Sequence, residues 1–110
     1  MSLTWILTLL LACAEPDAGD TSSCGAEDHA VTWDGYTRGF FLTYCAACHS
    51  SSATERYGAP EGVDFDTPQQ VLDQAERVRA RVLEAQTMPL GGGVPAEDLT
   101  LLAEWLDCPR

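Results

Sequence analysis

The stretch TYCAACHSSS, residues 43–52, contains two cysteines three positions apart, with a histidine directly after the second. Three kinds of site use such a pattern: a structural zinc ion, a redox-active disulfide and a covalently attached haem. Each kind of site needs different support from the rest of the chain, so the surrounding sequence can discriminate among them.

Two of these sites lack that support. A thioredoxin-like disulfide has its CxxC at the start of a helix that follows a strand, whereas here an aromatic-rich segment that predicts a helix precedes Cys45 and no strand pattern is found. Structural zinc needs two ligands besides the two cysteines of the motif. His49, His29 or Cys24 could supply them, but the chain has no second CxxC and no HxxxH pair.

Covalent haem accounts for the spacing physically. Two thiols separated by two residues can add to the vinyl groups on one edge of the porphyrin, and the adjacent histidine then lies beneath the iron. Cys45 and Cys48 are therefore the predicted thioether residues, and His49 is the predicted proximal ligand. Thioether attachment takes place outside the cytoplasm, so this interpretation requires an exported chain.

The remaining sequence predicts an all-α fold with three helices joined by long loops. The first helix covers about 35–44, with Asp34 as its N-cap, and leads into CAACH. The second begins after Thr67, where TPQQ supplies an N-cap, a proline at the first position and a glutamine three residues after the cap, and it ends near 85 or 86. The third covers about 96–106. Such long loops are unusual in a small helical domain, but a large apolar cofactor would give them a surface to pack on.

Composition limits the size of the domain and the kind of partner. A chain of 110 residues forms one domain with a small core, which a cofactor or cross-link would help to stabilise. It has 17 acidic and six basic residues, for a net charge of −11, and it contains no lysine. This excludes a nucleic-acid-binding protein and predicts that any charged partner presents a basic docking face.

The N-terminal residues predict export. Residues 1–12 are apolar and uncharged, too few to span a bilayer but suited to a signal peptide. The stretch LLAC, which ends at Cys13, resembles the lipobox of bacterial lipoproteins. That resemblance implies a lipid on Cys13 and a tether to a membrane, and Ala14 in place of Asp favours the outer membrane. The alternative is a buried N-terminal helix. Residues 13–23 are predicted to be a flexible acidic linker, and 24–110 the folded domain.

From residue 34 to residue 108 the chain resembles the class I cytochrome c family. That family has an N-terminal helix, CxxCH, a loop, further helices, a methionine in a loop and a C-terminal helix that crosses the first. Phe41 stands where the family has an aromatic residue, and Trp105 is its expected packing partner. Thr37 replaces the family's usual glycine at the crossing, so Gly35 or Gly39 is expected to allow the close approach.

The same resemblance suggests how the iron would be held. Met88 lies in TMPLGGG, which is similar to the family's methionine loop, and is the expected sixth ligand. The alternatives are that Met88 fills a gap in the core and that His29 is the ligand. In the family, a backbone carbonyl of a loop proline orients the proximal histidine, and Pro60 is the candidate here.

His/Met ligation closes both axial positions of the iron, which suits electron transfer rather than enzymatic chemistry. The predicted function is therefore that of a monomeric, periplasmic, membrane-tethered carrier of single electrons between redox proteins. One alternative is a haem peroxidase or haem sensor with an open iron site. Another is a zinc-binding interaction module without haem.

The remaining cysteines, Cys24 and Cys108, stand at the two ends of the predicted domain. An even remainder in an oxidising compartment favours a disulfide, and the crossing of the first and last helices would bring their flanking segments together. The alternative is two independent buried thiols.

Overall fold

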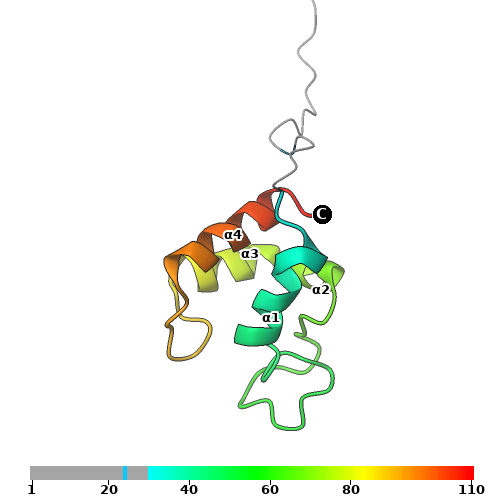
Figure 1. The fold of residues 1–110 in the computed structure, drawn as a ribbon. Helices are drawn as coiled ribbons and strands as arrows, with labels where there is room; N and C mark the ends of the chain where they lie inside the picture. The colour runs from blue at the N-terminus through cyan, green and yellow to red at the C-terminus, as the bar shows by residue number, and fades with distance from the viewer. Residues whose placement is uncertain (1–23, 25–29) are drawn as a thin grey trace, which may run out of the picture.

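The computed structural model describes Cys24 and residues 30–110, and this part of the chain is helical without a strand (Figure 1). The first helical segment joins a π-helical stretch, η2 (Trp33–Thr37), to α1 (Arg38–Tyr44). The second consists of α2 (Pro68–Asp73), α3 (Ala75–Val78) and a π-helical stretch, η3 (Arg79–Glu84). The last is α4 (Ala96–Asp107). The predicted all-α class is confirmed for the described residues.

The first helical segment begins earlier than the sequence predicts. Thr32 has an extended backbone, and its side-chain oxygen accepts a hydrogen bond of 2.9 Å from the Gly35 N–H. Thr32 is therefore the N-cap, and the prediction that Asp34 has this role is wrong. Asp34 lies in the first turn instead, where a carboxylate is favourable beside the positive end of the helix dipole.

The second helical segment has the start that the sequence predicts. The Thr67 hydroxyl accepts from the Gln70 N–H at 3.2 Å, and the Gln70 side-chain oxygen accepts from the Thr67 N–H at 3.0 Å. Pro68 occupies the first helical position, where no N–H is needed. A break at Gln74, with φ of −111°, separates α2 from α3. The segment ends at Glu84, close to the predicted end near 85 or 86, and Gln86 has a positive φ of 52°.

Apolar side chains from all three helical segments form one core. The buried members are Phe40, Phe41, Val71, Val78, Val82, Leu102, Trp105 and Leu106. Trp33 is only partly buried, yet its ring centroid lies 6.0 Å from that of Phe41 and 5.5 Å from that of Trp105. Trp33 therefore links the two aromatic residues that the sequence pairs across the first and last helical segments.

Neither glycine of the first helical segment allows a close helix approach. A Cβ on Gly39 would meet nothing within 4 Å, and a Cβ on Gly35 would collide with its own cap, the Thr32 hydroxyl, at 2.6 Å. The expectation that one of them serves the helix crossing is therefore wrong. Thr37 is fully buried in η2, the element that packs on α4.

A carboxylate from α4 joins two turns of the first helical segment. The Tyr36 hydroxyl donates to Asp98 Oδ1 at 2.5 Å, and the Tyr44 hydroxyl donates to Asp98 Oδ2 at 2.9 Å. Burial and the bond to Asp98 raise the pKa of Tyr36 far above its usual range, and the bond to Asp98 also raises the pKa of Tyr44. Both hydroxyls therefore stay protonated as donors.

The two ends of the described chain are joined covalently. Cys24 and Cys108 form a disulfide, which is the pair that the sequence predicts. Nearby, the Arg110 carbonyl accepts from the Trp33 N–H at 2.7 Å and from the Trp105 indole N–H at 3.2 Å, and the Arg110 guanidinium donates to the Cys24 carbonyl. The segment after α4 thus holds the start of the first helical segment.

Candidate functional site

The CAACH motif forms a turn at the end of α1. The Phe41 carbonyl accepts from the Cys45 N–H at 3.0 Å, and the Cys45 carbonyl accepts from the N–H groups of Cys48 and His49 at 3.2 and 2.8 Å. This turn continues the helical sense of the chain for one more step, so residues three and four positions apart share a face. The Cys45 and Cys48 side chains lie near enough for one thiol to affect the pKa of the other, and His49 follows in the same turn.

Both cysteines of the motif are free thiols and are partly buried. Burial, assisted by the neighbouring Cys48 thiol, raises the pKa of Cys45 to about 12. Cys45 is therefore protonated at neutral pH in the folded chain. The absence of a Cys45–Cys48 disulfide leaves both sulfurs able to form a bond to another group.

His49 is held in one orientation. Its Nδ1 lies 2.8 Å from the Val63 carbonyl oxygen, so Nδ1 donates a hydrogen to it, and in the neutral imidazole Nε2 then carries the free lone pair. The Phe65 ring lies beside the imidazole, with ring centroids 5.2 Å apart. The prediction that the Pro60 carbonyl orients His49 is wrong. That carbonyl accepts instead from the Arg56 guanidinium and from the Val63 N–H.

The long loop after His49, residues 50–66, is closed at its base. The Phe65 N–H donates to the His49 carbonyl at 2.8 Å, and Asp66 accepts from the Ser51 N–H at 3.0 Å and from the Ser51 hydroxyl at 2.7 Å. The hydrogen bond from the Ser51 backbone N–H is the main cause of the lowered pKa of Asp66. Together these bonds return the chain to His49 and hold Val63 against the imidazole.

Met88 lies in a separate loop, residues 87–95. Its N–H donates to the Arg81 carbonyl at 3.1 Å, as does the Thr87 N–H at 2.8 Å, which anchors the start of the loop to η3. The Met88 side chain is 36% exposed and is not part of the core, so it does not fill a gap there. In the view of Figure 1 both long loops lie below α4, on the side where α1 ends.

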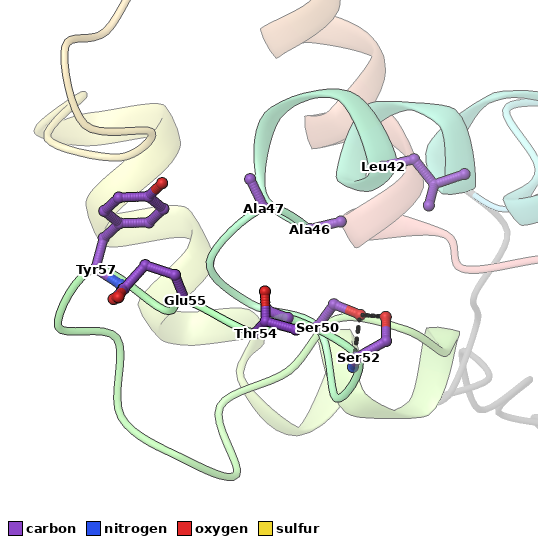
Figure 2. A pocket seen from close by; sticks show the side chains of 9 residues that line it. Leu42, Ala46, Ala47, Ser50, Ser52, Thr54, Glu55 and Tyr57 are labelled. Carbon is purple, nitrogen blue, oxygen red and sulfur yellow. Dashed lines mark hydrogen bonds between the residues drawn. The ribbon is translucent and has the colours of Figure 1, made fainter.

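An open pocket of about 450 Å³ lies between the end of α1 and the first half of the loop after His49 (Figure 2). One wall contains Leu42, Ala46 and Ala47, and the other is made by residues 50–57, including Tyr57. Ala46 and Ala47 are the two residues between the motif cysteines. None of the predicted haem-binding side chains lines this pocket.

The structure bears on zinc binding through Cys24. A four-coordinate site would need two ligands beyond Cys45 and Cys48, and Cys24 is not free to ligate because it is bonded to Cys108. Within residues 30–110 and Cys24, no group of three or more His, Cys, Asp or Glu side chains is arranged to hold a metal ion.

The donor set fits a covalent haem. Two free thiols, an imidazole whose Nδ1 is occupied and whose Nε2 is free, and a thioether outside the core are the groups that such a cofactor requires.

Sequence reasoning missed three residues near the imidazole: Val63 and Phe65, which contact His49, and Arg56, which binds the Val63 carbonyl. Arg56 carries a readable signal, because it is the single basic residue in the loop after His49. Val63 carries none, since it acts through its backbone carbonyl, which every residue has.

Several predictions concern residues outside the described part of the chain: the signal peptide at 1–12, the lipid on Cys13, the linker at 13–23 and the role of His29. Among the described residues, no helix combines the length and the apolar character needed to cross a bilayer. Comparison of the chain with known protein families, with characterised proteins and with solved structures finds no match.

Proposed function

We propose that this chain is a mono-haem c-type cytochrome that transfers single electrons between redox proteins and transforms no substrate. The observation that carries the proposal is the state of the CAACH turn. Cys45 and Cys48 are unpaired thiols there, and the Val63 carbonyl fixes the adjacent His49 in the tautomer that an iron ligand needs.

The haem would supply a one-electron couple, and the chain's own residues would hold and orient it. Cys45 and Cys48 would form the thioether bonds, and His49 would bind the iron through Nε2. The Val63 carbonyl keeps a hydrogen on Nδ1, while the Phe65 ring restricts rotation of the imidazole. Met88 is the proposed sixth ligand, and its exposed position leaves its sulfur free for this role.

A cytochrome c-like fold is part of the proposal. The order of elements supports it, since α1 precedes CAACH, a long loop and a helical segment follow, and the Met88 loop precedes α4. Contacts of α4 with η2 bring the last and first helical segments together.

The proposed setting is the periplasmic face of a bacterial membrane, with a lipid on Cys13 as the anchor. The net charge of −11 supports docking on basic redox partners, by attraction that weakens as the salt concentration rises. The proposed carrier acts as a monomer, without nucleic acid.

The first test asks whether haem is covalently attached. After acid-acetone extraction of the exported full-length protein, the pyridine haemochrome spectrum should remain with the polypeptide and should indicate two saturated vinyl groups. Cys45→Ser and Cys48→Ser should each leave one vinyl group unsaturated. Ser51→Ala should leave both vinyl groups saturated. Haem that extracts fully, or its absence from the exported protein, would refute the proposal.

The second test concerns the sixth ligand and separates an electron carrier from an open-iron peroxidase or sensor. Met88→Ala should let carbon monoxide bind to the reduced protein and should lower the reduction potential. Leu90→Ala is the matched control, because Leu90 lies in the same loop and is 71% exposed. Carbon monoxide binding to the unmodified protein would favour the open-iron alternative.

A further inference from the structure

Arg56 places a positive charge inside the loop that holds His49. Its guanidinium donates to four backbone carbonyls of the loop after His49: Ser50 at 2.8 Å, Ala59 at 3.3 Å, Pro60 at 2.9 Å and Val63 at 3.1 Å. The side chain is only 17% exposed. A planar fork of five N–H donors is suited to gather several carbonyls in this way, and a lysine ammonium could not reproduce the arrangement.

Asp64 balances the positive charge of Arg56, although its Oδ1 accepts no hydrogen bond from the guanidinium. Its Oδ1 lies 2.8 Å from Arg56 Nη2, and its side chain is 13% exposed. That oxygen nevertheless receives no hydrogen bond, because Nη2 directs its donors to the carbonyls of Pro60 and Val63. The carboxylate therefore acts on Arg56 through charge, and the guanidinium remains committed to the backbone.

The Val63 carbonyl is shared by two donors. It accepts from His49 Nδ1 at 2.8 Å and from Arg56 Nη2 at 3.1 Å. A carbonyl oxygen has two lone pairs and can accept both bonds, but a cationic donor on one side makes it a weaker acceptor for the other. The strength of the histidine bond is therefore linked to a side chain seven residues away.

We propose that Arg56 is a positioning residue that acts through the Val63 carbonyl to fix the orientation of His49 and to limit the electron donation of its imidazole. This inference rests on the proposed haem function. A weaker bond at Nδ1 makes the imidazole less electron-donating, which favours the reduced state of the iron. The positive charge of Arg56 favours the reduced state as well, so both effects raise the reduction potential.

Reduction potentials of the haem-loaded full chain test this directly. Arg56→Gln removes the charge and most of the fork, and should lower the potential by at least the equivalent of a threefold change in the redox equilibrium, about 28 mV for one electron. Asp64→Asn leaves the guanidinium uncompensated and should raise the potential. Arg56→Lys keeps the charge without the fork, so its potential should fall between those of Arg56→Gln and the unmodified protein.

A control and a second readout separate this role from a purely structural one. Arg77→Gln removes one positive charge from an exposed helix face and should shift the potential by less than half as much. The NMR signal of the His49 Nδ1 proton should move in Arg56→Gln and stay in place in Arg77→Gln.

The outcomes distinguish the two proposals. If Arg56→Gln loses stability while its potential and the His49 signal stay unchanged, Arg56 merely holds the loop and the inference fails. If Arg56→Gln does not fold, Asp64→Asn and Arg56→Lys decide, and unchanged potentials in both overturn the inference. A chain that carries no covalent haem refutes the proposed function instead.

Discussion

The loop after His49 and the loop around Met88 both contain glycines with positive φ, but they are held in different ways. In residues 50–66, side chains of Arg56 and Asp66 bind the backbone at both the centre and the base of the loop. In residues 87–95, the hydrogen bonds at the start run mainly from backbone N–H groups to one carbonyl, that of Arg81. Exposure of large side chains does not distinguish the loops, since Tyr57 in the first is 69% exposed and Leu90 in the second is 71% exposed.

The contrast indicates a division of roles around the candidate site. The His49 side is fixed by the fold itself, because its orientation depends on a closed loop and on the adjacent, tilted Phe65 ring. The Met88 side has fewer restraints, and local stability is low where few buried contacts and few hydrogen bonds hold a segment. If the proposed function holds, the cofactor would complete the second side while the first is already in place.

Removing the disulfide should have the largest effect on stability, and it should destabilise the His49 loop and the Met88 loop alike. Replacing Cys24 and Cys108 together with Ser opens a ring of about 85 residues, which should lower the free energy of unfolding by about 4–5 kcal/mol on the chain-entropy model. Urea unfolding of the full chain measures this loss. Treatment of the unmodified protein with a reductant should give the same loss, and a loss below about 1 kcal/mol would show that the cross-link contributes little.

The second prediction separates the two loops. Phe65 contacts both His49 and Phe41, with ring centroids 5.2 and 5.3 Å apart, so Phe65→Ala should cost about 2–3 kcal/mol, less than for a fully buried phenylalanine. The exposed Leu90 offers a matched truncation in the other loop, and Leu90→Ala should cost less than about 0.5 kcal/mol. Equal losses in urea unfolding would remove the contrast between the loops.

The smallest effect concerns pH and the base of the first loop. The pKa of Asp66 is lowered chiefly by the Ser51 N–H, so its ionised form favours the folded state. This stabilisation is present above the pKa of the unfolded chain, near 4, and is lost as the pH falls through the lower folded value. Urea midpoints at pH 7 and pH 3 should therefore differ less in Asp66→Asn than in the unmodified protein.

Asp73→Asn provides the control for that measurement, because Asp73 is exposed and lies on α2 outside the loop. It should leave the pH dependence close to that of the unmodified protein. An Asp66→Asn protein whose midpoints depend on pH as strongly as before would show that the Ser51 contacts do not stabilise the fold.

Local signals in the sequence predicted the structure well. The Thr67 capping box depends on residues within one turn, so its geometry could be read from TPQQ. The bounds of α4 and the end of η3 followed from apolar spacing and from the prolines and glycines around them. The start of the first helical segment was missed because two suitable caps, Thr32 and Asp34, stand close together, and only the backbone decides between them.

The sequence names the candidate side chains, but it does not tell which backbone groups surround them. CAACH identifies Cys45, Cys48 and His49 by residue type and spacing alone. Which carbonyl meets the imidazole depends on the path of a 17-residue loop, and Val63 rather than Pro60 reaches it. The role of Trp33 between Phe41 and Trp105 likewise depends on how distant segments pack, which single-sequence periodicity does not encode.

The Cys24–Cys108 bond also changes what a cut in the chain would do. Because the backbone between these residues is a closed covalent ring, one break in the exposed Met88 loop yields a single molecule with two new ends, not two fragments. The piece that contains CAACH and the piece that contains Trp105 would remain bound to each other. A nicked protein of this kind would keep its mass, apart from one added water, until a reductant separates the pieces.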